Sequence, residues 1–224
     1  MTTVYIVRHA EAVGNSEFRF NGITDTDITE KGEHQLDSLA ERFRSVSFDR
    51  IYSSPLIRTR KTADAVNRFH GLDIIIDNDI IEINGGSWEG RKMDEVGKES
   101  PELVMMWVKD PLNFKAPDGE SMRDVFARVS SALKRLAAEN QGKTIVVVSH
   151  GCAIKNMLCY ASTGDMSEIG KPDIAENTAV SKVIFDDALN ASVEFSNDSS
   201  HLSEELKTFR RAMKENTHME EISQ

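Results

Sequence analysis

The segment T3-V-Y-I-V-R-H-A-E-A12 decides how this chain folds, because an apolar run ends abruptly in two basic residues. Its Val, Tyr, Ile and Val residues are types that favour a β-strand. Within an unbroken strand, the side chains of Arg8 and His9 would point to opposite faces of the sheet. They can converge only where the strand ends and the chain turns. The segment therefore predicts a strand with a site at its carboxyl end.

Other short apolar runs predict further strands, with helical patterns between them. The strand candidates after Val4–Val7 are Arg50–Ser53, Ile74–Ile76, Ile80–Ile83, Thr144–Ser149 and Ala179–Phe185. Apolar residues three and four apart predict helices over Thr29–Arg44 and after the Ser121–Asp124 capping pair. Such alternation is typical of a mostly parallel sheet covered on both faces. We therefore expect an α/β fold, a three-layer α/β/α sandwich, with Thr144–Ser149 as a central strand.

Residues 84–118 interrupt this alternation. The stretch is rich in Gly and Pro and predicts a small, mainly helical insert or lid beside the sheet. We expect one domain over residues 1–202 that contains this insert. Residues 203–224 are expected to form a C-terminal helix and a polar tail.

Composition narrows the class of protein. The 224 residues carry a formal net charge of -10, which argues against a nucleic-acid binder. No signal-peptide pattern opens the chain, and no apolar run approaches the length of a membrane span. Cys152 and Cys159 are seven residues apart on a predicted helix, too far apart to form a disulfide with each other. We expect a cytoplasmic protein with reduced thiols and no membrane contact, and a homodimer is plausible.

Polar side chains follow four of the predicted strands, where the carboxyl ends of a parallel sheet usually bind ligands. They are Arg8 with His9, Arg58, Glu82, and His150 with Gly151. Two guanidinium groups and a helix beginning after His150 suit a phosphate group. A neutral histidine is a competent nucleophile, and a carboxyl group can protonate a leaving alcohol. Together these residues predict a phosphoryl-transfer site.

The same residues carry a family resemblance. R8-H9-A10-E11, with Asn15 after it, resembles the signature of the histidine phosphatase superfamily, which includes the cofactor-dependent phosphoglycerate mutases. Similar blocks follow in family order up to residue 202: N15-S-E-F-R-F-N-G-I-T-D25, I28-T-E-K-G32, S53-S-P-L-I-R-T-R-K-T-A63, E82-I-N-G-G-S-W-E-G90, D118-G-E-S121, V148-S-H-G151 and F195-S-N-D-S-S-H-L202. Ala10 and Ala12 depart from the usual Gly and Ser or Thr.

The resemblance implies a role for each matching residue. His9 would be the nucleophile that forms a phosphohistidine, and Glu82 would be the acid and then the base. The phosphate oxygens would be held by Arg8, Arg58 and His150, with Asn15 nearby and Gly151 allowing a close turn. Possible substrate-side residues are Arg19, Gly22 and Arg91. Trp107 fits either the core of the insert or the substrate mouth, and no role is assigned to His201.

These implied roles predict a phosphomonoester hydrolase that acts on small phosphorylated metabolites. The arginines would supply the positive charge, so we expect no metal and no cofactor. A phosphoglycerate mutase is the first alternative, although Ile83-Asn-Gly-Gly replaces the basic and aromatic residues that follow the equivalent Glu in mutases. The second alternative is a regulatory protein that binds a phosphorylated ligand without turning it over.

Overall fold

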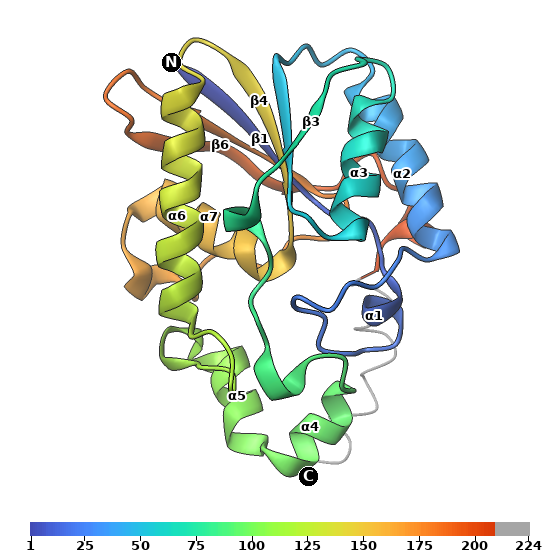
Figure 1. Cartoon of the computed structure of the whole chain (residues 1–224), viewed down its shortest axis with the longest axis vertical. Helices are drawn as coiled ribbons and strands as arrows, with labels where there is room; N and C mark the ends of the chain where they lie inside the picture. The colour runs from blue at the N-terminus through green and yellow to red at the C-terminus, as the bar shows by residue number, and fades with distance from the viewer. Residues whose placement is uncertain (209–224) are drawn as a thin grey trace.

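The computed structural model describes residues 1–208, and in them six strands form one sheet in the order β3-β2-β4-β1-β5-β6 (Figure 1). The strands are β1 (Thr2–Arg8), β2 (Arg50–Ser53), β3 (Ile74–Ile76), β4 (Thr144–Ser149), β5 (Val180–Phe185) and β6 (Ala191–Asp198). The first four strands in this order, β3, β2, β4 and β1, are mutually parallel, and β5 and β6 are antiparallel to their neighbours. The predicted α/β class with a mostly parallel sheet is confirmed.

Helices cover both faces of the sheet (Figure 1). Alternate residues of β4 separate into two cores: Ile145 and Val147 pack in the cluster that contains α6 (Met122–Glu139) and α7 (Gly151–Thr163). Val146 and Val148 pack in the cluster that contains α2 (Glu30–Phe43) and α3 (Ile57–Asn67). The unbroken apolar run at positions 145–148 satisfies both cores, which explains why Thr144–Ser149 forms a central strand.

Local capping fixes the two longest helices. Thr29 accepts a hydrogen bond from Gly32 N at the start of α2. At the start of α6, Ser121 and Asp124 form the expected capping box, with each side chain accepting from the other's backbone N–H. The short helix α1 (Val13–Ser16) has no counterpart in the sequence prediction.

The segment 84–118 lies at one end of the sheet, at the bottom of Figure 1. It holds a 3₁₀ turn at Gly86–Trp88, then α4 (Met93–Glu99), α5 (Pro101–Lys109) and a second turn at Pro111–Asn113. The rings of Trp88 and Phe114 are 5.3 Å apart, and Trp107 lies 4.9 Å from Phe114. These aromatic contacts give the segment a core of its own, continuous with the α6–α7 side of the sheet.

The predicted set of strands needs two corrections. The Ile80–Ile83 prediction is wrong, because Asn78–Ile80 is a 3₁₀ turn capped by Asp77 and the chain continues from it as irregular structure. The edge strand β6 was not predicted. Near the end of the described chain, Glu204–Leu206 forms one 3₁₀ turn, and the rest of the predicted tail, residues 209–224, lies outside the described residues.

No helix within residues 1–208 is long and apolar enough to cross a membrane. Cys152 and Cys159 are free thiols, as the sequence predicts.

Candidate active site

The two histidines lie side by side where adjacent parallel strands end. β1 ends at Arg8 and β4 ends at Ser149, and these two residues are paired across the ladder. His9 and His150 follow them, and the backbone N–H of His9 donates to the carbonyl of Ser149 at 3.0 Å. The two imidazole rings are 5.2 Å apart and tilted by 57°. The predicted convergence of both histidines at one sheet edge is therefore present.

His9 is oriented by its own segment and by a neighbouring loop. Its Nδ1 lies 2.7 Å from the carbonyl oxygen of Ala10, which can only accept, so Nδ1 carries the proton and Nε2 keeps its lone pair. The carbonyl of His9 accepts from Asn177 Nδ2 at 3.0 Å and from Thr178 N at 3.3 Å. Burial, and then the charges of Arg58 and Arg8, hold the pKa of His9 well below its usual value. The imidazole is therefore neutral at neutral pH.

His150 is the N-cap residue of α7 and is fully buried. Its Nε2 lies 2.7 Å from the hydroxyl of Ser54, while its Nδ1 is a buried atom with no hydrogen-bond partner among the described residues. Burial, followed by the charges of Arg58 and His9, lowers the pKa of His150 well below its usual value. If the Ser54 hydroxyl donates to Nε2, the proton of the neutral ring is on Nδ1 and available to a ligand.

Two buried guanidinium groups accompany the histidines. Arg58, in the first turn of α3, is 0% exposed and donates to the carbonyls of Thr24 at 2.8 Å and Gly22 at 2.6 Å. Its Nε is buried without a partner in the described part of the chain. Burial lowers the pKa of Arg58 to about 10. Arg8 donates to the carbonyl of Ala175, and burial lowers its pKa as well.

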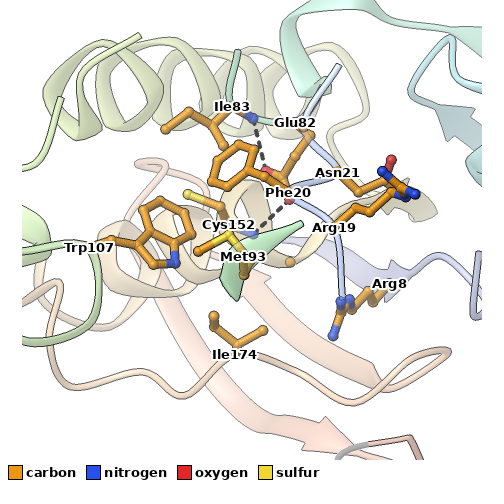
Figure 2. Close-up of a pocket in the computed structure, with 12 residues that line it drawn as sticks. Arg8, Arg19, Phe20, Asn21, Glu82, Ile83, Met93, Trp107, Cys152 and Ile174 are labelled. Carbon is orange, nitrogen blue, oxygen red and sulfur yellow. Dashed lines mark hydrogen bonds between the residues drawn. The ribbon is translucent and has the colours of Figure 1, made fainter. Parts of the chain in front are cut away.

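Glu82 joins this group through the start of α7. The carboxylate is 7% exposed, and its Oε1 accepts from Ile83 N at 3.0 Å and Ala153 N at 2.9 Å. Its Oε2 accepts from Cys152 N at 3.0 Å; Figure 2 shows the bonds from Ile83 and Cys152. A carboxylate at a helix N-terminus satisfies N–H groups that the helix leaves unpaired. Glu82 is thus fixed by α7, although no strand leads into it.

Gly151 is the point where α7 approaches a guanidinium group. A Cβ built on Gly151 would lie 3.4 Å from Cζ of Arg8 and 3.3 Å from Cγ2 of Ile174. Such contacts are tight, so the absence of a side chain allows Arg8 to pack against the first turn of the helix.

A cavity of about 180 Å³ opens beside these groups. Figure 2 shows the residues that line it, which come from β1, the loop after α1, positions 82–83, the 84–118 segment, α7 and the loop before β5. They are Arg8, Arg19, Phe20, Asn21, Gly22, Glu82, Ile83, Met93, Trp107, Gly151, Cys152 and Ile174. Arg19 and Gly22, two of the predicted substrate-side residues, line this cavity. His9, Arg58 and His150 do not line this cavity.

Two further predicted residues, Arg91 and Asn15, do not line the cavity and have local partners. Arg91 pairs with Glu99 of α4 at 2.6 Å and is absent from the cavity wall. Asn15 is used locally: its Oδ1 accepts from Ala12 N at 3.0 Å at the start of α1. Neither contact can be predicted from a motif. The Arg91–Glu99 pair depends on the fold of the 84–118 segment, and the Asn15 contact depends on α1, a short helix that was not predicted.

Several residues that line the cavity were not predicted from the sequence. Phe20, Asn21, Met93 and Ile174 line the cavity without being singled out, and Ser54 is the partner of His150. Phe20 directly follows Arg19 inside a quoted motif, which was the one available signal. Trp107 packs in the core of the 84–118 segment against Phe114, and it also lines the cavity.

His201 lies behind the site, in a polar network. Its Nδ1 accepts from Arg42 at 3.0 Å, and Arg42 also binds the Asp198 carboxylate at 2.6 Å. Its Nε2 lies 3.2 Å from the hydroxyl of Thr178, whose backbone N–H bonds to His9. Burial and Arg42 lower the pKa of His201 to about 4.

No group of three or more His, Cys, Asp or Glu side chains within residues 1–208 is arranged to hold a metal ion.

Comparisons with known proteins match this arrangement to a family. The model of the histidine phosphatase superfamily (branch 1) matches residues 4–198. Phosphoserine phosphatase 1 of Hydrogenobacter thermophilus is 36% identical over 168 residues, which is 75% of this chain and 80% of that protein. A probable phosphoglycerate mutase, GpmB of Escherichia coli O1:K1, is 35% identical over 212 residues, 90% of this chain and 95% of its own.

A solved structure has a similar fold. Bacillus stearothermophilus YhfR superposes with a TM-score of 0.85 at 28% identity, covering 91% of this chain and 100% of its own. The family resemblance inferred from the motifs is confirmed: the chain belongs to the histidine phosphatase superfamily, branch 1.

Proposed function

We propose that this protein is a phosphomonoester hydrolase that works through a phosphohistidine at His9. One observation carries the proposal: a neutral histidine with a free Nε2 lone pair lies beside two buried nitrogens, Arg58 Nε and His150 Nδ1, that have no partner among the described residues. Buried polar atoms are nearly always hydrogen-bonded, so an unpaired cluster indicates a site for an anion. Relatives named as phosphatases support the same reaction.

The first step transfers the phosphoryl group to the enzyme. His9 Nε2 attacks phosphorus, and the bond between phosphorus and the ester oxygen breaks. Arg8, Arg58 and His150 stabilise the charge on the non-bridging oxygens, and Glu82 gives the leaving oxygen its proton. Glu82 suits this task because it lines the cavity. We call Arg8, His9, Arg58, Glu82 and His150 the phosphate end of the site.

The second step releases inorganic phosphate. Water attacks the phosphohistidine, the bond between Nε2 and phosphorus breaks, and the Glu82 carboxylate takes the proton of the water. The sum of both steps is one ester and one water consumed, and one alcohol and one phosphate formed. The positive charge comes from two arginines, so we propose that the reaction needs no metal ion.

A mutase would use the same first step and return the phosphoryl group to a bound sugar acid. The GpmB relative, a probable phosphoglycerate mutase, gives this alternative its support. The two reactions differ in the acceptor, which is water in one and an alcohol in the other. The same preparation can therefore be assayed for both.

The test is phosphate release from p-nitrophenyl phosphate in excess EDTA, with wild type beside His9→Ala. His34→Ala is the matched control, because His34 is an exposed histidine on α2. Release by wild type and His34→Ala, but not by His9→Ala, supports the proposal. Complete loss of wild-type activity in EDTA would overturn the metal-free part. Release that persists in His9→Ala would overturn the role of His9, and interconversion of phosphoglycerates without net phosphate release would favour the mutase.

A further inference from the structure

The cavity next to the phosphate end has one markedly apolar side. Phe20, Ile83, Met93 and Trp107 supply it, and Figure 2 shows Phe20, Met93 and Trp107 around one side of the space, with the Arg8 guanidinium at the other. We call these four residues the apolar wall. Because Glu82 lines the same cavity, the wall lies on the side from which a leaving alcohol protonated by Glu82 would extend. The wall is therefore placed to contact the alcohol portion of the ester.

The aromatic part of this wall is held in place from behind. The ring of Phe20 meets Trp88 edge-on at 5.5 Å and meets Trp107 at 5.5 Å. Trp107 in turn packs on Phe114 at 4.9 Å. Edge-to-face contacts of this kind stabilise a defined ring arrangement. The apolar wall is therefore preformed and does not depend on a ligand to assemble it.

The chain after Glu82 cannot place a polar side chain at this wall. A Cβ at Gly85 would lie 2.3 Å from Cε1 of Phe20, so the phenyl ring occupies the space that a side chain there would need. Asn84 does not line the cavity, and its Oδ1 accepts from Gly86 N at 2.9 Å. Ile83 is the remaining contribution of this stretch to the wall.

Arg19 is the one cation on the lining besides Arg8, among the residues that the structure describes. Its Nε donates to Glu17 Oε2 at 2.6 Å, and its NH1 donates to the carbonyl of Gly90 at 2.8 Å. A carboxylate on a substrate would have to compete with Glu17 for this guanidinium. An uncharged group would leave the ion pair intact.

We propose that the preferred substrates are phosphomonoesters of uncharged, ring-bearing apolar alcohols, and not of amino acids or sugar acids. This inference rests on the hydrolase function proposed above. A cavity of about 180 Å³ is of the size that accepts an aromatic ring, since engineered apolar cavities of roughly 150 Å³ bind benzene. The ring would stack against Trp107 and Phe20 while the phosphate lies between Arg8 and His9.

The experiment compares kcat/KM for benzyl phosphate, ethyl phosphate and O-phosphoserine. All three release an alkyl alcohol, so differences in leaving group are small. We expect benzyl phosphate to exceed O-phosphoserine by at least about tenfold. Trp107→Ala should lower kcat/KM for benzyl phosphate by about tenfold and leave ethyl phosphate within about twofold. Met105→Ala is the control, because Met105 lies on the same helix, is 53% exposed and does not line the cavity.

Preference for O-phosphoserine, combined with its loss in Arg19→Gln, would overturn the proposal and assign Arg19 to a substrate carboxylate. A drop of equal size on benzyl and ethyl phosphate in Trp107→Ala would also overturn it, since the change would then act on the phosphate end.

Calorimetric binding separates this inference from the hydrolase function. Benzylphosphonate and 2-amino-4-phosphonobutyrate resist hydrolysis and carry the two kinds of side group. Tighter binding of benzylphosphonate supports the substrate class even if no ester is turned over, in which case only the hydrolase function fails. Tighter binding of the amino acid analogue contradicts the substrate class whatever the hydrolase assay shows.

Discussion

The phosphate end and the apolar wall of the site come from different parts of the fold. Arg8, His9 and His150 stand where buried parallel strands end, and Arg58 follows in the first turn of α3. The apolar wall comes from the loop after α1 through Phe20, from the 84–118 segment through Met93 and Trp107, and from Ile83 just before that segment. The sheet therefore positions the residues that react with the phosphate group. The segments beside the sheet determine the shape of the cavity next to them. Changes at Met93 or Trp107 should leave the phosphate end largely intact.

The largest expected effect is at the phosphate end. His9→Ala should lower kcat by at least roughly 10³-fold, because the change removes the nitrogen that attacks phosphorus. Its melting temperature should stay within a few degrees of wild type, since His9 contributes little apolar burial. Turnover in EDTA and a thermal melt of the same sample check both parts. A collapsed melting curve would make His9 a structural residue.

Glu82→Gln should have the next largest effect, and it should depend on the ester. An amide cannot deliver a proton to a leaving alkoxide, so alkyl phosphates should slow by about 10²-fold. p-Nitrophenyl phosphate should slow much less, because its leaving group needs little protonation. Steady-state kcat for both esters provides the comparison. Equal slowing would remove the general-acid assignment and leave Glu82 as a cap of α7.

Gly85→Ala should affect the apolar wall alone. The new methyl group would press on the Phe20 ring, and we expect a loss of about 1–3 kcal/mol of unfolding free energy. Hydrolysis of benzyl phosphate should fall relative to ethyl phosphate by several-fold. Urea unfolding and the ratio of kcat/KM values measure the two effects.

Gly97→Ala is the matched control, since a Cβ there meets no atom within 4 Å and the residue lies in α4. It should be neutral or slightly stabilising. If Gly85→Ala behaves like this control, Phe20 is free to move and the wall is not preformed.

The smallest effect concerns His201, behind the phosphate end. Its folded pKa of about 4 is below that of an unfolded histidine, so the unfolded state binds more protons between about pH 4 and 6.5. The stability associated with the neutral ring is present above that window and is lost as the pH falls through it. Lowering the pH from 7.5 to 5 should therefore destabilise wild type by on the order of 1–2 kcal/mol more than His201→Gln.

Urea midpoints of both proteins at the two pH values test this prediction. The buried His9 and His150 are present in both proteins, so their own titrations cancel in the difference. An equal loss of stability in wild type and His201→Gln would show that His201 does not contribute to the acid sensitivity.

The phosphate end was predictable because its residues directly follow apolar runs or lie within quoted motifs. Glu82 lies in this group although its predicted strand was wrong: Ile80, Ile81 and Ile83 read as a strand, but Asp77 caps a 3₁₀ turn that ends at Ile80. The edge strand β6 was missed because alternate residues are exposed and the run is polar overall. Such a strand is specified by pairing with β5 more than by its own composition.

The apolar wall was much less predictable. Phe20, Met93 and Trp107 are far apart in the sequence, and their meeting depends on how α4 and α5 pack. The pairing of Arg91 with Glu99 was not predictable for the same reason, because it is determined by the fold of that segment. Local patterns predict strand ends well, whereas contacts between irregular segments depend on long-range packing that no motif encodes.

The pairing of Arg8 with Ser149 has a consequence for engineering the protein. The distance between the two histidines derives from the spacing of neighbouring strands, about 4.8 Å, and not from any loop. Exchanging residues 84–118 or the loop after α1 for segments of other sequence should therefore leave the spacing of His9 and His150 unchanged. Substrate preference could therefore be changed by replacing these segments while the sheet keeps His9 and His150 in place.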